Sequence, residues 1–260
     1  MGKMSSTTDE IKKACVTDEY GVATELKQIS LNDVDLLPVQ TQLNLIPCEL
    51  RYLMQQSQFT NKGTAGSIYN GTISNITYDV DSSPIFNGNN NHSTASIVDT
   101  NLPQNVCTNT NTISIIAHIP NNGTARKANR GLLGDYNYSP GNSKGLQFAE
   151  YKAGATYTVD WEKSATLSVP SSKIPDTYCM ISLVHDVSVQ RLYIDAELIG
   201  TLNQTFTPLA DTFKLGRAYN ALDERYFMGK MRMLEISTTK AFTAQEIQNQ
   251  YDEYKSLGIV

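Results

Sequence analysis

The chain has 260 residues, of which 40% are hydrophobic and 18% are charged, and its formal net charge at pH 7 is −5. This length suits one large all-β domain or two small domains. Scattered basic residues in an acidic chain argue against nucleic acid as a partner. No apolar run reaches the roughly 18 residues of a membrane-spanning helix, which argues against membrane insertion. The polar N-terminal residues also lead us to expect no secretory signal peptide.

Residues 1–47 differ in pattern from the rest of the chain. A capping-box sequence at 7–10 precedes apolar residues at helical spacing up to Cys15, which predicts one short helix. The remaining residues up to Pro47 are too few to enclose a core of their own. We therefore expect an N-terminal assembly arm that lies on its own domain or on a neighbouring molecule. The apolar residues assigned to this contact are Ile11, Leu31, Leu36 and Leu37.

From residue 48 to residue 260, short runs of β-type residues alternate with turn clusters. Their spacing of roughly 10 to 12 residues is typical of an all-β sandwich. Residues 87–93 are predicted to form a polar loop, and 131–145 a long loop or two short strands. The predicted strands are 50–54, 73–78, 85–86, 112–119, 146–151, 156–161, 165–169, 179–185, 191–194, 212–215 and 227–236.

The last predicted element is a helix. A second capping-box sequence, at 243–246, begins it. Ile247, Tyr251 and Tyr254 share one face at helical spacing, and Gly258 is a suitable end.

The four cysteines, at positions 15, 48, 107 and 179, are widely spaced. They form no C-x-x-C pair, which argues against a zinc site. We expect reduced, buried thiols.

Three stretches together resemble laminin-G-like domains of the concanavalin-A-like lectin/glucanase superfamily. They are 69–73 with 83–88 (YNGTI and SPIFNG), 178–200 (core CMISLVHDVSVQRLYIDAELIG), and 213–216 with 227–231 and the helix at 242–251. The resemblance covers roughly residues 48–260. It implies an antiparallel β-sandwich, or jelly roll, with a C-terminal helix.

The second stretch departs from the family at Ala196, where a glycine is usual, and at Tyr178, where tryptophan is common. We expect the turn to use a different geometry, or Asp195 to adopt a positive φ. Leu192, Ile194 and Leu198 are predicted to face one side of the sheet. Glycines 216 and 229 suit positions where strands bend or approach closely.

Aromatic rings beside polar side chains suggest sugar binding, because rings offer apolar surface and polar groups offer hydrogen bonds. Two such clusters fall near 136–161 and 219–226, although the same aromatic residues also suit packing at the sandwich edges. The glycan-binding candidates are Tyr136, Tyr138, Tyr151, Trp161, Tyr219, Arg225 and Tyr226.

Domains of the family that the chain resembles often bind calcium, and a calcium ion requires several oxygen ligands from loops. No loop here has the closely spaced Asp residues of a strong calcium site. We expect no other cofactor. The calcium candidates are Asp79, Asp81, Asp99 and Asp135.

Catalytic patterns are weak. Glycoside hydrolysis needs two carboxyl groups flanking one bond, and the glucanase pattern E-x-D-x-x-E is absent. The pairs Asp195 with Glu197 and Asp160 with Glu162 are interpreted as solvated turn or strand-end residues. The three histidines lie far apart in the sequence, so we expect no enzyme.

Three functions remain open. The main hypothesis is a non-catalytic virion protein of a bacteriophage, a capsid decoration or tail-fibre component. Its arm would bind other virion proteins within an oligomer or larger assembly, and the sandwich would face outward toward cell-surface glycans. The virion, assembled in the host cytoplasm, is the location that this hypothesis implies. The alternative is a carbohydrate-binding lectin module of a bacterial protein, and the third is a glycoside hydrolase.

Overall fold

The computed structural model describes residues 15–17, 23–25, 46–88, 93–120, 129–134, 144–150, 156–162, 166–206, 208, 211–217 and 226–260. The chain divides into two compact units, Met1–Leu43 and Asn44–Val260. In the first unit, β1 (Cys15–Thr17) pairs antiparallel with β2 (Ala23–Glu25).

This hairpin corrects the predicted N-terminal helix at Cys15, which lies in a strand. The neighbouring Val16 and Thr17 are β-branched and favour extended backbone, and Gly21 lies between the two strands, where a turn residue is needed. The rest of the predicted helix, and all four apolar arm residues, lie outside the described residues.

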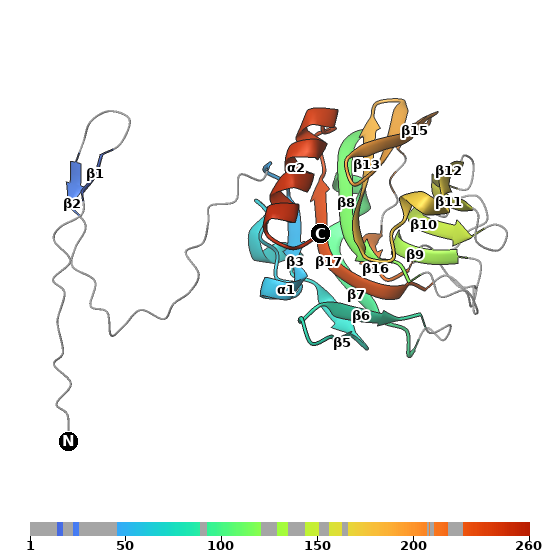
Figure 1. The fold of residues 1–260 in the computed structure, drawn as a ribbon, viewed down its shortest axis with the longest axis horizontal. Helices are drawn as coiled ribbons and strands as arrows, with labels where there is room; N and C mark the ends of the chain where they lie inside the picture. The colour runs from blue at the N-terminus through green and yellow to red at the C-terminus, as the bar shows by residue number, and fades with distance from the viewer. Residues whose placement is uncertain are drawn as a thin grey trace, which may run out of the picture. The chain divides into compact units, whose positions relative to one another are not determined.

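The second unit consists of two antiparallel sheets (Figure 1). The seven-stranded sheet runs, from neighbour to neighbour, β12 (Thr166–Pro170), β11 (Thr156–Glu162), β10 (Lys144–Glu150), β9 (Asn129–Gly134), β16 (Thr212–Leu215), β7 (Ile97–Pro103) and β4 (Thr72–Ser74). The eight-stranded sheet runs β15 (Glu197–Asn203), β14 (Val189–Ile194), β13 (Tyr178–Asp186), β8 (Thr110–His118), β17 (Met228–Ser237), β6 (Pro84–Asn87) and β5 (Thr77–Tyr78), and β3 (Leu50–Leu53) also pairs with β17.

Short helices connect some of these strands. They are α1 (Met54–Ser57) and the 3-10 turns η1 (Gly66–Tyr69), η2 (Gln104–Val106) and η3 (Ser171–Lys173), while α2 (Ala244–Ser256) follows the last strand.

One hydrophobic core fills the space between the sheets. Alternate residues of most strands point into it, as the period of two along a strand requires. The consecutive Leu132 and Leu133 of β9 are the exception, at the point where the register with β10 shifts. The seven-stranded sheet contributes Val98, Leu102, Leu132, Leu133, Phe213 and Leu215, and the eight-stranded sheet contributes Ile113, Ile115, Ile181, Leu183, Leu234 and Ile236. The predicted all-β antiparallel sandwich is confirmed.

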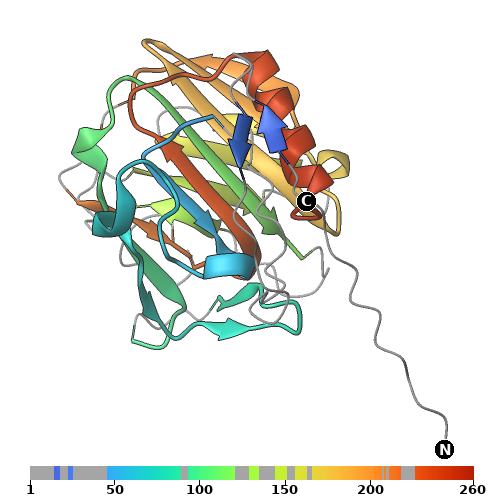
Figure 2. The same cartoon turned by 90° about the vertical axis from the view of Figure 1, so that its left-hand side faces the viewer.

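Helix α2 covers the outer face of the eight-stranded sheet (Figures 1 and 2). Its Ile247 and Tyr254 are fully buried. In β8 and β13, all residues except the first and the last are buried, so both faces of these strands are covered. The predicted capping box is present: Thr243 Oγ1 accepts from the Glu246 amide, and Glu246 Oε2 accepts from the Thr243 amide. Gly258, with φ +68°, follows the helix as predicted.

The two glycines singled out in the sequence do lie at close approaches. At Gly216 (φ +84°), a Cβ would lie 2.5 Å from Phe86 Cδ1. At Gly229 (φ +155°), it would lie 2.4 Å from the carbonyl oxygen of His118. No side chain fits at either position without displacing its neighbours.

The turn between β14 and β15 has positive φ at both central residues, 48° at Asp195 and 65° at Ala196. The two-residue turn pairs Tyr193 with Leu198. Leu198 therefore does not share a face with Leu192, and the prediction that it does is wrong; its side chain is 51% exposed.

Strand β7 was missed by the sequence analysis. Its buried residues Val98, Thr100 and Leu102 alternate with the more exposed Asp99 and Asn101, a period-two pattern that favours a strand. The predicted loop or pair of strands at 131–145 includes most of β9 and the first residues of β10.

Cys48, Cys107 and Cys179 are free and buried, as expected. Burial, reinforced by the charge of Glu49, raises the pKa of Cys107 to about 12. In the described part of the chain, no helix has the length and apolar character needed to cross a bilayer.

Candidate functional site

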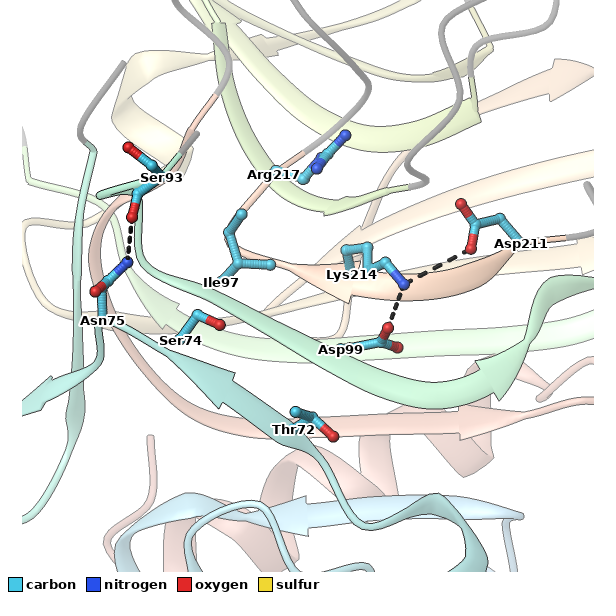
Figure 3. A pocket seen from close by; sticks show the side chains of 9 residues that line it. All are labelled: Thr72, Ser74, Asn75, Ser93, Ile97, Asp99, Asp211, Lys214 and Arg217. Atoms are coloured by element: carbon cyan, nitrogen blue, oxygen red, sulfur yellow. Dashed lines mark hydrogen bonds and ion pairs between the residues drawn. The ribbon is translucent and has the colours of Figure 1, made fainter. Parts of the chain in front are cut away.

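A groove of about 790 Å³ lies on the outer face of the seven-stranded sheet, where β4, β7 and β16 are neighbours. Its residues Ile97 and Asp99 alternate with Val98, which points into the core. The volume falls within the range of about 300–1,000 Å³ that is usual for small-molecule sites. Figure 3 shows Asp99, Lys214 and Asp211 at one end, Asn75 and Ser93 at the other, and Ile97 and Arg217 between them.

The charged end is an interlocked network around Lys214. The ammonium group of Lys214 donates to the Asp99 carboxylate and to the Thr212 hydroxyl, and it lies 3.6 Å from Oδ1 of Asp211. Thr212 Oγ1 in turn donates to Asp99 Oδ1 at 2.7 Å. Only 11% of the Lys214 side chain is exposed, so these partners hold it in one position.

Asp99 is held as an anion. Partial burial alone would raise its pKa, but hydrogen bonds from Lys214, Thr212 and the amide of Asn101 outweigh burial and lower the pKa below its usual value. At neutral pH this side chain therefore only accepts hydrogen bonds.

The other end is held by Asn75, which adopts φ +53°. Its Nδ2 donates to the carbonyl oxygens of Ser93 and Ala95, both at 3.2 Å. Its backbone oxygen accepts from Ser96 Oγ at 2.7 Å. Among the described residues, the side-chain oxygen of Asn75 is left as an acceptor.

Arg217 also lines the groove, with 2% of its surface exposed. Its backbone bridges that of Tyr226, so Tyr226 lies beside the groove. Tyr226 is the one predicted glycan-binding residue whose side chain belongs to the described part of the chain. Trp161 lies in β11, and its side chain is not described. The candidates outside the described residues are Tyr136, Tyr138, Tyr151, Tyr219 and Arg225.

The calcium candidates that the structure describes each pair with a basic residue. Asp79 contacts Lys230, and Asp81 Oδ2 accepts from Arg232 Nη2 at 2.8 Å. Asp99 pairs with Lys214, as above, and Asp135 lies outside the described residues. Within the described ranges, no group of three or more His, Cys, Asp or Glu side chains is arranged so that it could hold a metal ion.

Asp195 and Glu197, considered as a catalytic pair, have separate partners. Asp195 Oδ1 accepts from the Met180 amide at 2.8 Å, and Glu197 pairs with Lys173 at 2.6 Å. Their contacts support the hairpin between β14 and β15. The side chains of Asp160 and Glu162 are not described.

The two described histidines also have structural partners. His118 Nε2 lies 3.3 Å from Asp176, and His185 Nδ1 lies 3.0 Å from Asn111 Oδ1. This agrees with the expectation of packed or hydrogen-bonded histidines in strands.

Most groove residues were missed by the sequence analysis, which singled out only Asp99, and as a calcium ligand. The alternation of buried and polar residues in β7 and in β16 (T-F-K-L) would have indicated that Asp99 and Lys214 face outward. The pairing of β7 with β16, at the register Asp99 to Lys214, carries no local sequence signal.

No protein-family profile matches the chain, and the search for related curated proteins found no match. Solved structures do match the fold. Domain 4 of an extracellular arabinanase from Geobacillus stearothermophilus, solved with arabinotriose, has a TM-score of 0.55 and 15% identity, with 78% of this chain and 97% of that domain covered.

Two longer proteins match in part. The binding domain of botulinum neurotoxin serotype D has a TM-score of 0.55 and 14% identity, covering 79% of this chain and 50% of that one. A Trypanosoma rangeli sialidase in complex with sialic acid has a TM-score of 0.54 and 13% identity, covering 72% and 30%. This chain thus spans half or less of these two proteins. At such identities the likeness shows the fold, an antiparallel β-sandwich that also occurs in an arabinanase and a sialidase.

Proposed function

We propose that the Asn44–Val260 unit is a carbohydrate-binding module and that its groove over β4, β7 and β16 holds the saccharide. The observation that carries this proposal is the chemistry of the groove. Fixed hydrogen-bonding groups stand at both ends, and the aliphatic side chain of Ile97 lies between them.

A sugar ring is complementary to such a groove. Its hydroxyl groups donate and accept hydrogen bonds, and its C–H groups form an apolar face. Asp99 and Asp211 accept, while Thr72 and Ser74 both donate and accept. Because the Asp99–Lys214 network is already formed, binding requires little ordering of side chains, which favours affinity.

The neighbours with known ligands support the same class of function. The arabinanase domain was solved with arabinotriose, and the sialidase was solved with sialic acid. A shared fold does not by itself determine function, so the groove chemistry carries the proposal and the neighbours add to it.

A glycan array probed with the full chain tests the proposal, followed by calorimetry on the saccharides that bind. Ser74→Leu, which inserts bulk into the groove from an exposed position, should weaken binding at least tenfold. Ser188→Leu makes the same change at an exposed turn of the other sheet and should leave the affinity unchanged. If no saccharide on the array binds, or if both variants bind like the parent, the proposal fails.

We infer that the module binds without cleaving. A glycosidase needs one carboxyl group that holds a proton near neutral pH, whereas Asp99 is kept ionised by Lys214. Incubation with each bound saccharide should release no new reducing ends. Release that is lost in Asp195→Asn or Glu197→Gln would instead revive the hydrolase hypothesis.

The virion role remains a prediction that rests on the N-terminal arm, residues 1–47. None of the neighbours described above is a virion protein. Limited proteolysis with mass spectrometry of the fragments tests the arm. Rapid loss of residues 1–47 with a surviving core would favour an arm that a partner orders, and resistance to cleavage would remove the main support for an assembly role.

A further inference from the structure

We infer that the groove selects neutral saccharides over acidic ones, an inference that rests on the proposed function and names its ligand class. The groove contains two carboxylates, of Asp99 and Asp211, and two cations, of Lys214 and Arg217. The selectivity follows from which of these charges still have hydrogen-bonding capacity to offer a ligand.

The Lys214 ammonium group has little to offer a ligand. Of its three N–H donors, two form hydrogen bonds with the Asp99 carboxylate and the Thr212 hydroxyl. The ammonium also forms an ion pair with Asp211 Oδ1 at 3.6 Å. With 11% of the side chain exposed, Lys214 has little freedom to turn toward a ligand. An incoming carboxylate would have to compete with two carboxylates that are already in place.

Arg217, the second cation of the groove, is almost fully buried. Its surface is 2% exposed, and it has an interaction partner of its own. A buried guanidinium of this kind stabilises the wall of the groove.

The carboxylates, in contrast, keep acceptor capacity. An ionised carboxylate has about four lone-pair sites. Asp211 Oδ1 accepts from the Thr212 amide at 2.7 Å and faces Lys214 at 3.6 Å. Among the described residues, Asp211 Oδ2 has no partner. Asp211 therefore has an open acceptor.

The groove thus offers an open carboxylate oxygen, whereas both of its cations are largely buried and already have partners. This difference defines the ligand. A sugar hydroxyl donates to a carboxylate, and hydrogen bonds with an ionised acceptor are the stronger kind. The carboxylate of a uronic or sialic acid has no proton to donate at neutral pH. It would face Asp99 and Asp211 as like charges in a partly buried site, where repulsion is only weakly screened.

The test is an array that carries neutral and acidic saccharides in matched pairs, such as methyl-esterified and free-acid oligogalacturonides, probed with the full chain. We expect the bound set to be neutral, with at least a tenfold weaker affinity for the acidic member of each pair. Equal or stronger binding of acidic saccharides overturns the selectivity but leaves the proposed function standing. Binding of no saccharide at all overturns both.

Asp211→Asn tests whether the Asp211 carboxylate contributes to the preference for neutral saccharides, because the variant keeps the shape of the groove. This variant removes one negative charge, so we expect neutral saccharides to bind about tenfold more weakly and the preference over acidic ones to narrow. Asp252→Asn makes the same change on the exposed face of α2 and should alter neither. An unchanged preference in Asp211→Asn contradicts the inference.

The affinity of the unmodified chain for its saccharide, measured at several salt concentrations, is a further test that needs no variant. Affinity for the neutral ligand should change less than twofold between low and high ionic strength. A neutral saccharide carries no net charge, so added salt has little attraction to screen. A steep fall with added salt would indicate a charge-driven site and would overturn the selectivity.

Discussion

The hydroxyl group of Tyr254 in helix α2 donates a hydrogen bond to the carboxylate of Glu235 in strand β17, with 2.5 Å between the two oxygens. Glu235 is 1% exposed and Tyr254 is fully buried. The same carboxylate accepts from Gln250 Nε2 at 2.7 Å and from Arg51 Nη2 at 2.8 Å. One buried anion thus joins the helix, β17 and β3.

Removing the Tyr254 hydroxyl should weaken this junction measurably. Tyr254→Phe keeps the ring but deletes a hydrogen bond to a charged acceptor, so the free energy of unfolding should fall by about 1.5–3 kcal/mol. Urea unfolding followed by circular dichroism gives the value. Tyr251→Phe, on the same helix but partly exposed, is the control and should change stability by less than about 0.5 kcal/mol. Equal effects in the two variants would contradict the role assigned to Glu235.

His185 should make stability depend on pH. Burial lowers its pKa to about 3, whereas the unfolded side chain titrates near 6.5. Between these values the unfolded state binds the extra proton. The stability that His185 contributes is therefore complete above about pH 6.5 and is lost, by about 1.4 kcal/mol per pH unit, as the pH falls toward 3.

Urea unfolding of the parent chain and of His185→Gln between about pH 7 and 5 measures this effect. The slope of stability against pH should be smaller in the variant by about 1 kcal/mol per unit on average over this range, approaching about 1.4 kcal/mol per unit near pH 5. If the two slopes coincide, His185 is not buried in its neutral form.

The turn at Asp195 and Ala196 should be improved by glycine. Both φ values are positive, and a Cβ in that region costs roughly 1–2 kcal/mol. Ala196→Gly removes this strain but adds freedom to the unfolded chain, so we expect a net gain of about 0.5–1 kcal/mol by urea unfolding. Ala65→Gly, at φ −75°, should lose about 0.4–1 kcal/mol. A loss at both positions would contradict the geometry of the turn.

Tyr136 and Tyr138 follow Gly134, whose Cα pairs with that of Lys214 in the groove. If these tyrosines take part in glycan binding, replacing both with alanine should abolish retention on an immobilised saccharide that the parent binds. Tyr78→Ala, at a partly exposed position on edge strand β5 of the other sheet, should leave retention intact. Unchanged retention in the double variant would restrict binding to the groove itself.

Local patterns in the sequence predicted much of the fold because their physical causes are local. The capping box at Thr243 and Glu246 needs only residues three apart. The glycines at 216 and 229 are visible in the sequence as well, but part of the reason for them is tertiary, because a Cβ there would meet Phe86 and the carbonyl oxygen of His118. The face of Leu198 was predicted wrongly because the number of residues in the turn sets which strand positions are opposite each other.

The sequence by itself determined an all-β chain with a C-terminal helix and buried thiols, since alternation, turn residues and helix caps act over a few residues. Only the tertiary structure decided where the groove lies. Asp99 and Lys214 are 115 positions apart, and Arg51 and Glu235 are 184 apart. Such pairs meet because strands distant in the sequence become neighbours when the two sheets bury a common core, and that choice of neighbours depends on the packing of the whole sandwich.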